Sequence, residues 1–446
     1  MTATKSALTG AEVAAGSALA NTTVVIFTHR TPFSEVPEFV EDEWPAWRNA
    51  KRVLVISLAE SQERSNRLTP NCTAHAVAPA RSVLAKLRYA ASAAIHVPWL
   101  SEMGRILRAG PRLFGRRLLA LATDLQAAGR YRLGLLRVLA REPLAPDEAI
   151  VLYSYWLGAA TKAGVSLTRH LRTPKVVRVT RAHGSDLYEY AHPENYLPSR
   201  RYALTHIDAA YPISRSGADY IVRHWACDAA KVHIARLGIP DHFKGRYPER
   251  RDTFTVFSCS YISDLKRVDM IAEAVSRLQA TRVHWIHVGG GSGEATLRTR
   301  CESFLGGKAN LTYELVGSLP HDRTIALLEQ TNINVLVNAS TSEGIPVSMM
   351  EAHCSGIPVI GPNVGGVGEI VDSGINGTML DPPLTPEILA SAIQTLIDMA
   401  PRQYDALCRR ARASWERKFS ADVNYPAFVA SVAGLIRSSF TTPSRS

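Results

Sequence analysis

The chain has 446 residues, of which 46% are hydrophobic and 20% are charged, a composition typical of folded globular proteins and unlike that of disordered chains. Its formal charge of +11, from 51 Lys and Arg against 40 Asp and Glu, favours an anionic partner such as nucleic acid, lipid headgroups or a phosphate-bearing substrate. No run approaches about 18 apolar residues, which excludes a membrane-spanning helix. The six cysteines form no C-x-x-C pair, which argues against a zinc knuckle or disulfide framework and fits a reducing cytosol.

The first half of the chain predicts one doubly wound domain. Residues 1–21 are rich in Ala, Thr and Ser and predict a flexible tail rather than a signal peptide. Behind the tail, short β-branched runs alternate with stretches of helical spacing, a pattern that predicts a parallel sheet covered on both faces by helices. The expected strands are 23–29, 52–57, 149–156, 175–180 and 209–214.

Residues 81–142 interrupt this alternation and predict a basic helical insertion. They hold twelve Lys or Arg against three acidic residues, an excess of nine that nearly accounts for the charge of the whole chain. Breaks are expected at Pro98 and at Gly110 and Pro111.

One face of the last helix in this insertion is cationic. Arg130, Arg137 and Arg141 fall within about 40° of one another around a helix, opposite a set of leucines. The face is either a solvated surface or a docking site for anionic lipid. Nucleic acid is the third possibility, and the lack of aromatic interleaving or of a known binding module counts against it.

The alternation of strands and helices restarts after the Gly-, Pro- and charge-rich stretch 237–252. A second strand set is expected at 253–260, 282–289, 311–317, 333–340 and 357–362. The chain is therefore predicted to be of the α/β class, with two doubly wound, Rossmann-like domains that face a central cleft. The first domain is expected to span 22–240 and the second 241–419, with 420–446 as a C-terminal helix that packs back on the first.

The stretch NASTSEGIPVSMMEAHC, residues 338–354, predicts an anion site at a helix start. A buried strand is expected to end at Ser340, and Pro346 is expected at the first helical position. Free amides at such a start point outward and bind phosphate. Glu343 on the loop and Glu351 about one turn inside the helix are then placed to accept hydrogen bonds from hydroxyls, including a ribose diol. Alone, the two acids could equally be a helix-start carboxylate and a solvated helix residue.

Their surroundings decide between these two interpretations. The run SEGIPVSMMEAHCSGIPVIGPNVGGVGEIVDSGINGTMLD, residues 342–381, closely resembles the donor-binding signature of retaining glycosyltransferases of the GT-B fold, family 4, of the surface-polysaccharide type. The resemblance implies that Glu343 contacts donor-sugar hydroxyls and that Glu351 holds the ribose. The backbone implied to lie against the sugar and the distal phosphate is that of Gly344, Ile345, Pro346 and Val347.

Further donor-side residues follow from the same resemblance. Lys266, in DLKRVDMIAEAV, corresponds to the family's phosphate-binding lysine, with Arg267 beside it. Tyr261 stands where many members carry an arginine, a departure that matters because a phenol does not neutralise phosphate. The loop at Val316 and Gly317 is implied to face the base.

In the first domain, VTRAHGSDLYE resembles the family's strand-end histidine motif. His183 is implied to lie near the reacting sugar, and Asp186 to open the next helix; the plainer alternative for His183 is a satisfied turn histidine. The weaker candidates for the acceptor or sugar side are Arg181, Ser214 and Glu369.

The glycine run that begins at Gly289 suggests a different class of enzyme, a dinucleotide oxidoreductase. The G-x-G-x-x-G fingerprint fails, however, because its last position is Glu294. A dehydrogenase is therefore disfavoured.

The resemblance implies a metal-independent retaining glycosyltransferase, and the chain contains no D-x-D pair. The expected co-substrate is a UDP- or GDP-linked sugar, with no other cofactor, and the expected acceptor is a saccharide or a lipid-linked saccharide of the cell envelope or of exopolysaccharide. The expected location is the cytoplasm, peripherally on the inner face of the cell membrane through 81–142, with no nucleic-acid partner. Two alternatives stay open: another GT-B enzyme such as a nucleotide-sugar epimerase, and a non-catalytic basic binding protein with a degenerate donor pocket.

Overall fold

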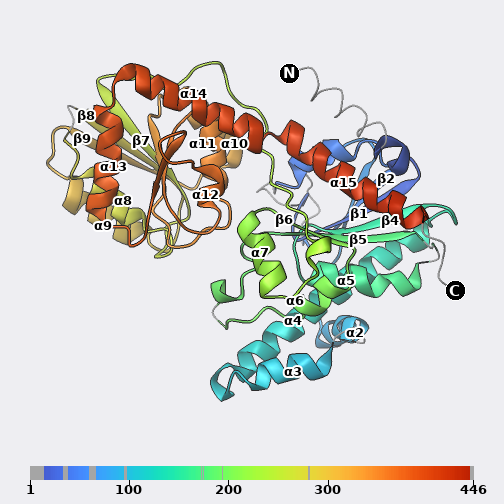
Figure 1. Ribbon diagram of the computed structural model, residues 1–446. Coiled ribbons are helices and arrows are strands. Elements are labelled where there is room, and N and C mark those ends of the chain that lie inside the picture. The colour runs from blue at the N-terminus through green and yellow to red at the C-terminus, as the bar shows by residue number, and fades with distance from the viewer. Residues whose placement is uncertain are drawn as a thin grey trace. The chain divides into compact units, whose positions relative to one another are not determined.

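The computed structural model describes residues 15–33, 39–59, 67–94, 98–171, 173, 175–192, 194–279 and 282–441. The chain divides into two compact units, Met1–Gly238 together with Asp422–Ser446, and Ile239–Ala421. Each unit has a six-stranded sheet and its own hydrophobic core (Figure 1). All of the strand pairs are parallel, which confirms the predicted α/β class with two doubly wound domains.

The sheet of the first unit has the strand order β3-β2-β1-β4-β5-β6. Its strands are β1 (Thr22–Thr28), β2 (Arg52–Ser57), β3 (Cys72–Ala76), β4 (Ala149–Ser154), β5 (Val176–Ala182) and β6 (Ala209–Pro212). Side chains alternate between two cores, since Val24 and Ile26 pack with one face and Val25 and Phe27 with the other. Burial on both faces explains why these strands are almost continuously apolar in sequence.

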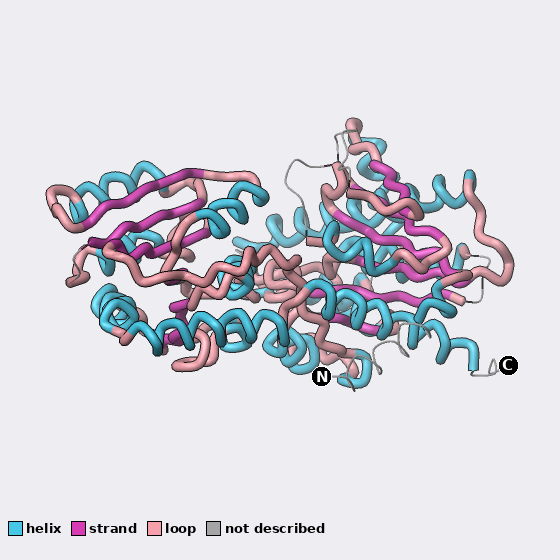
Figure 2. The backbone as a smooth tube through the Cα atoms, turned by 90° about the horizontal axis from the view of Figure 1, so that it is seen from above, coloured by secondary structure: helices cyan, strands magenta, loops and turns pink. Residues whose placement is uncertain are grey.

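Helices cover both faces of this sheet. The long helix α15 (Ala421–Thr441) contributes Phe428 and Val432 to the first core, and α4 (Pro111–Arg141) and α5 (Ala159–Leu167) contribute to the second. Figure 2 shows the strands of each sheet side by side, with helices packed against them. The remaining elements of this unit are η1 (Glu41–Trp47), α2 (Val83–Ala94), α3 (Trp99–Leu107), η2 (Thr168–His170), η3 (Glu189–Ala191), α6 (Arg200–Thr205), α7 (Arg215–Arg223) and η4 (Ala229–Lys231).

Helices α2, α3 and α4 form the helical insertion. The two predicted breaks lie where the sequence placed them, because Pro98 is the N-cap of α3 and Pro111 follows the N-cap Gly110 of α4. Helices α2 and α4 cross closely at Gly129, where a Cβ atom would lie 1.9 Å from the carbonyl oxygen of Tyr89. Among the helices that the structure describes, none combines the length and apolar character needed to cross a bilayer.

Two sequence expectations for this unit are incomplete. Residues 15–19 of the expected tail are helical, and Ala15 and Leu19 are buried in the first core; residues 1–14 lie outside the described part of the chain. The strand β3 was not predicted; it lies at the edge of the sheet, and all of its residues but the first are partly buried or exposed. A half-exposed edge strand lacks the strong apolar pattern of a central one.

The sheet of the second unit has the order β12-β11-β10-β7-β8-β9. Its strands are β7 (Thr253–Cys259), β8 (Arg282–Val288), β9 (Leu311–Gly317), β10 (Val335–Val337), β11 (Val359–Pro362) and β12 (Gly377–Leu380). Its helices are α8 (Val268–Val275), α9 (Glu294–Leu305), α10 (His321–Gln330), α11 (Val347–Cys354), α12 (Val367–Ile370), α13 (Pro386–Asp398) and α14 (Pro401–Lys418).

The two sheets share one topology. In each unit the first strand lies beside the fourth, with the second and third on its other side. The order of the strands therefore reverses between β1 and β4, and again between β7 and β10. In sheets of this kind, ligands bind beyond the carboxyl ends of the strands at that point.

Candidate functional site

Lys266 and Glu343 meet at the switch point of the second sheet. Lys266 lies in the loop after β7 and Glu343 in the loop after β10, and these two strands are neighbours. The Nζ atom of Lys266 donates to Oε1 of Glu343 at 2.7 Å, and Nδ2 of Asn338 donates to the same oxygen at 2.9 Å. The lysine side chain is 22% exposed and that of the glutamate 8%. A cation thus faces solvent beside a carboxylate that is fixed in position.

Two glycines hold the loop that carries Glu343. The amide of Gly366 donates to the carbonyl of Gly344 at 2.7 Å. At Gly365, which has a φ of +54°, a Cβ atom would lie 1.7 Å from the carbonyl oxygen of Glu343. The loop after β11 therefore packs on the loop after β10, and a side chain at either glycine would displace it.

The N-terminus of α11 lies next to this loop. The helix begins at Val347, and Pro346 is its N-cap with φ −72° and ψ 112°; the expectation that Pro346 is the first helical residue is wrong by one position. No side chain of the described residues caps this end. The preceding Ile345 is buried and anchors the turn. Uncapped first-turn amides and the positive end of the helix dipole favour an anion here.

Glu351 lies in the second turn of α11 and is almost fully buried, with 5% of its side chain exposed. Its Oε1 lies 2.6 Å from Nε2 of His321, the first residue of α10. His321 was not predicted from the sequence. It could have been nominated because it follows the end of β9 by four residues, at the edge of the sheet where ligands bind. Burial, with the nearby charge of Glu351 as a smaller cause, raises the pKa of the Cys259 thiol to about 12. The cysteine therefore stays neutral near the site.

Glu351→Ala is expected to weaken binding of UDP or GDP by roughly 1.5–3 kcal/mol, the usual contribution of hydrogen bonds to a charged group. His321→Ala keeps the carboxylate of Glu351 but removes its partner, so a smaller loss of binding free energy is expected. Isothermal titration calorimetry measures both. The matched control is Glu329→Ala, which removes another partly buried acid, one paired with the exposed Lys244 at 3.5 Å. Unchanged affinity in the Glu351 variant would remove this residue from the site.

Arg267 supports the loop after β10. It has a left-handed backbone with φ 47° at the N-cap of α8, and its Nε donates to the carbonyl of Ala339 at 2.7 Å. Tyr261 is 61% exposed, and its hydroxyl accepts from the amide of Ser292 at 3.3 Å. The guanidinium of Arg267 is thus already engaged with the protein, and the phenol of Tyr261 supplies no charge.

The predicted base-side loop lies at the carboxyl end of β9. Val316 is half-buried there, and Gly317 ends the strand with a φ of +79°. The carbonyl of Gly317 accepts from the amide of Gly289 at 2.9 Å. This contact joins the loops after β8 and β9 at the same edge of the sheet as Lys266.

In the first unit, His183 directly follows β5 and is buried. Its ring centroid lies 4.3 Å from that of Trp156 and 4.9 Å from that of Tyr155. The nearest carboxylate oxygen, Oδ2 of Asp186, is 3.5 Å from Nδ1, and within the described structure neither ring nitrogen forms a hydrogen bond. This leaves a buried imidazole with unused hydrogen-bonding capacity, which the interpretation as a satisfied turn histidine does not fit.

Asp186 joins two strand ends. Its Oδ1 accepts from the amide of His183 at 2.6 Å, and its Oδ2 accepts from the amide of Leu157 at 2.7 Å. It lies in a turn before η3 and not at the start of a helix, so the helix-opening role expected for it is wrong. The carboxylate instead fixes the loops after β4 and β5 relative to each other.

The three weaker candidates for the acceptor or sugar side lie in different environments. Arg181 is fully buried and forms an ion pair with Glu43 at 3.0 Å, so the expectation that it contacts an acceptor is not supported. Ser214 caps α7 by accepting from the amide of Gly217 at 2.9 Å. Glu369 is half-buried on α12.

Among the described residues, no cluster of three or more His, Cys, Asp and Glu side chains has an arrangement that could hold a metal ion. Lys266 supplies a positive charge at this edge of the sheet, next to the uncapped start of α11.

Residues 241–413 match the family model described as glycosyl transferases group 1. The chain is 25% identical over 296 residues, 64% of its own length and 69% of the other, to the amylovoran biosynthesis glycosyltransferase AmsK of Erwinia amylovora. It is also 25% identical to the putative colanic acid biosynthesis glycosyltransferase WcaL of Salmonella typhimurium, over 62% of this chain and 68% of that one.

Solved structures resemble the whole chain in fold. Sucrose-phosphate synthase from Thermosynechococcus elongatus superposes with a TM-score of 0.66 at 16% identity, covering 94% of this chain and 99% of that one. The lipopolysaccharide outer core galactosyltransferase WaaB gives a TM-score of 0.62 at 13% identity, with coverage of 93% and 99%. HepE of Anabaena, solved in complex with UDP and glucose, gives 0.58 at 15% identity, with coverage of 94% and 99%.

Two doubly wound units, with a cation and two acids at one switch point, define the chain as a GT-B protein. The family match lies in its second unit, and together with the similarity to AmsK it confirms the resemblance to family 4-type glycosyltransferases that the sequence predicted.

Proposed function

We propose that the chain is a retaining glycosyltransferase that moves a sugar from a UDP- or GDP-sugar to a hydroxyl of a saccharide or lipid-linked saccharide. The observation that carries this proposal is the meeting of Lys266 and Glu343 at the switch point beside the uncapped start of α11. The names of AmsK and WcaL, which refer to amylovoran and colanic acid biosynthesis, support a role in exopolysaccharide or cell-envelope synthesis.

The proposed reaction depends on stabilising the negative charge of the leaving group. The bond between the anomeric carbon and the distal phosphate oxygen breaks, and negative charge develops on the departing diphosphate. Lys266 and the first-turn amides of α11 stabilise that charge without rearrangement. The acceptor oxygen bonds to the anomeric carbon on the same face, its proton passes to the leaving phosphate, and the configuration is retained. No metal ion enters the proposed step.

The proposed function is tested by titrating the chain with UDP and GDP and then analysing products from the matching nucleotide sugar. Binding of one nucleotide, together with acceptor-dependent sugar transfer that survives EDTA, is expected. A changed sugar without any acceptor would identify an epimerase. Binding of neither nucleotide would identify a degenerate pocket. Loss of transfer in EDTA would contradict metal independence.

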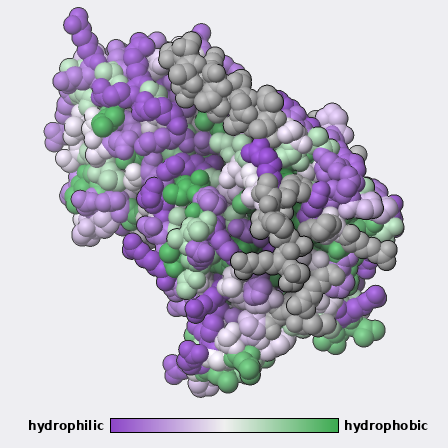
Figure 3. Space-filling view, turned by 45° about the vertical axis from the view of Figure 1, so that its right-hand side comes forward, coloured by the Kyte–Doolittle hydropathy of each residue, from purple (hydrophilic) through white to green (hydrophobic). Residues whose placement is uncertain are grey.

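We further propose that the insertion docks on anionic lipid at the inner face of the cell membrane. Val83, Leu84 and Leu87 of α2, and Leu100 and Leu107 of α3, are each more than 60% exposed. Exposed Lys86, Arg88 and Arg108 lie among them. Figure 3 shows hydrophobic and hydrophilic side chains intermixed at the lower end of the view, where Figure 1 places these helices. Exposed leucines next to basic groups are typical of interfacial helices.

The docking face differs from the one that the sequence predicted. The guanidinium of Arg130 donates to the carbonyls of Leu58 and Val77 and therefore binds protein backbone. Arg137 and Arg141 are exposed, but the large exposed apolar side chains lie on α2, α3 and the first half of α4. The proposed lipid contact therefore moves to α2 and α3.

Replacing Leu84 and Leu87 together by Asp is expected to reduce binding to vesicles of phosphatidylcholine and phosphatidylglycerol at low salt by more than about tenfold. Each buried leucine contributes roughly 1.5–3 kcal/mol. The control is Ile375→Asp, a half-exposed apolar residue in the second unit. Cosedimentation measures the bound fraction. Wild-type protein that does not bind, or a double variant that binds like it, would contradict the docking proposal.

A further inference from the structure

An irregular loop joins β5 to α6 in the first unit. This β5 loop comprises the described residues 183–192 and 194–199, and among them η3 is the one regular element. It opens with His183, which the family resemblance places near the reacting sugar, and its end at residues 196–199 is buried. Buried backbone carbonyls need donors, and a loop of this kind has no sheet or helix ladder to supply them.

Arg117 of α4, a helix of the insertion, supplies several of these donors. Its Nε and Nη2 donate to the carbonyl of Glu194 at 3.0 and 2.8 Å, and Nη2 also donates to the carbonyl of Asn195 at 3.1 Å. Its Nη1 donates to the carbonyl of Arg105 on α3 at 2.9 Å. The guanidinium carbon lies 5.3 Å from the ring centroid of Tyr196. One planar group, with a donor fork that only arginine has, thus joins the β5 loop to two helices of the insertion.

Arg105 of α3 holds the same loop at two further points. Its Nη1 donates to the carbonyl of Leu197 at 3.3 Å, and its Nη2 forms an ion pair with Glu189. Oε1 of Glu189 also accepts from the amide of Leu197 at 3.1 Å. Glu102, on the same helix as Arg105, accepts from the hydroxyl of Tyr196 at 2.6 Å. The middle and the end of the β5 loop are therefore tied together through a side chain of the insertion.

Two residues of the β5 loop have left-handed backbones. The φ values are 43° at Asn195 and 55° at Ser199. This conformation is uncommon for residues other than glycine and persists where surrounding contacts hold it. Arg117 binds the carbonyl of Asn195, and Ser199 is fully buried at the N-cap of α6. The conformation of the loop therefore depends on contacts from outside it.

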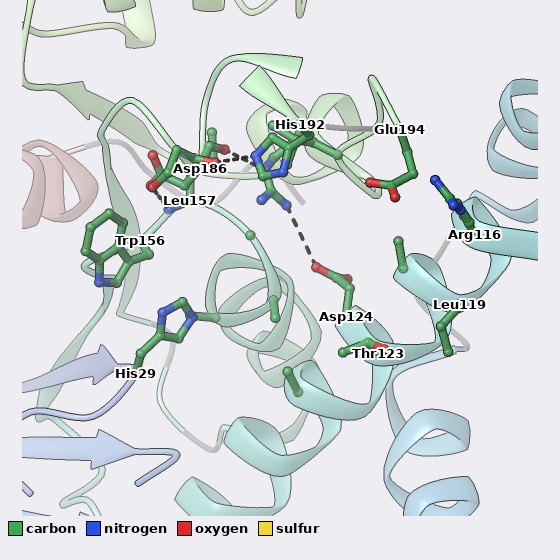
Figure 4. A pocket seen from close by; sticks show the side chains of 18 residues that line it. His29, Arg116, Leu119, Thr123, Asp124, Trp156, Leu157, Asp186, His192 and Glu194 are labelled. Atoms are coloured by element: carbon green, nitrogen blue, oxygen red, sulfur yellow. Dashed lines mark hydrogen bonds and ion pairs between the residues drawn. The ribbon is translucent and has the colours of Figure 1, made fainter. Parts of the chain in front are cut away.

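Contacts continue from the end of the β5 loop to His183. Nη1 of Arg200 donates to the carbonyl of Pro198 at 3.3 Å, and its Nε donates to the carbonyl of Asp186 at 2.9 Å. Oδ1 of Asp186 accepts from the amide of His183. Asp124 of α4 pairs with Arg200 at 3.8 Å. Figure 4 shows Asp186 on the loop side and Asp124 on the α4 side of a pocket that both line.

We infer that Arg105 and Arg117 are positioning residues, which hold the β5 loop and through it fix His183 relative to the reacting sugar. The inference rests on the proposed glycosyltransferase function. It gives the insertion, which lies outside the family resemblance, a role in turnover. That role is separate from the proposed lipid contact, because both guanidinium groups bind the β5 loop and not the exposed leucines of α2 and α3.

The test compares Arg117→Ala and Arg117→Lys with Arg112→Ala, which removes an exposed arginine of the same helix. Arg117→Ala is expected to lower kcat by about 10-fold to 100-fold, since a misplacement of about 1 Å can cost about 10² in rate. The affinity for UDP or GDP should not change, because that site lies in the second unit. Hydrogen–deuterium exchange should become faster in the β5 loop. Arg117→Lys, which keeps the charge but not the fork, should lose less, and Arg112→Ala should match the wild type.

Three results would overturn the inference. They are unchanged exchange in the β5 loop of Arg117→Ala, faster exchange with an unchanged kcat, and an equal loss of kcat in Arg112→Ala. Melting temperatures check the fold, and if Arg117→Ala does not fold, Arg117→Lys carries the same comparison. Wild-type protein that transfers no sugar would instead contradict the proposed function, so the two failures are distinguishable.

Discussion

Lys266→Ala is expected to lower kcat by about 10²–10³, the loss typical when one preorganised group that stabilises transition-state charge is removed. The ammonium lies at the switch point with 22% of its side chain exposed, next to the uncapped α11. Its charge interacts more strongly with a departing diphosphate than with the bound donor, so kcat and kcat/KM should fall together.

Three further variants test the role of Lys266. Lys266→Arg keeps the charge and should recover part of the rate. Arg298→Ala removes an exposed cation of the same unit, paired with Glu294 on α9, and should leave the rate unchanged. Because Lys266 also holds Glu343 at 2.7 Å, the double variant with Glu343→Gln should be non-additive. Turnover of Lys266→Ala within about threefold of wild type would remove the lysine from the mechanism.

Glu43→Ala is expected to lower the free energy of unfolding of the first unit by about 3–5 kcal/mol, since it leaves a buried cation without its partner. Arg181 and Glu43 are both fully buried, with Nε and Nη2 of the arginine each 3.0 Å from Oε2 of the glutamate. Burial is the largest single influence and would lower the pKa of Arg181, but Glu43 together with Tyr153, Tyr155 and Tyr425 outweighs it and the pKa is raised. The guanidinium also lies over the Phe428 ring of α15 at 4.3 Å, so the pair supports the packing of the C-terminal helix.

The matched control for Glu43 is its neighbour. Asp42→Ala breaks a pair with Arg67, whose side chain is 51% exposed, and such surface pairs contribute about 0–1 kcal/mol. Urea denaturation followed by tryptophan fluorescence measures both variants. Equal losses in the two variants would show that the buried pair does not stabilise the unit. Glu43→Gln retains hydrogen bonding without charge and should fall between them.

Most of the fold could be predicted from the sequence because both sheets are covered on two faces by helices. The run at β2 is almost continuously buried, and the strands β2 and β9 were both placed with the bounds that the structure has. The strands β3 and β12 were missed; β12 has four residues, three of them only partly buried. The breaks at Pro98 and Gly110 were found because proline and glycine act through local backbone geometry.

Less of the candidate site could be predicted from the sequence. The sequence grouped Glu343 with Glu351, but the neighbour of Glu343 in space is Lys266, which lies 77 residues earlier, and His321 was not expected beside Glu351. Arg181 was a weak candidate two residues before His183. Its partner Glu43, which comes from a distant 3-10 helix, could not be predicted from the local sequence. Such pairings depend on strand order, which a single sequence does not specify.

A crystal structure with the diphosphate that binds, UDP or GDP, tests the donor site most directly. The diphosphate is expected at the start of α11 within hydrogen-bonding distance of Lys266 Nζ, with the ribose hydroxyls on Glu351. A nucleotide bound elsewhere on the chain, or one at α11 with Lys266 still paired to Glu343 and out of reach of phosphate, would contradict the assignment.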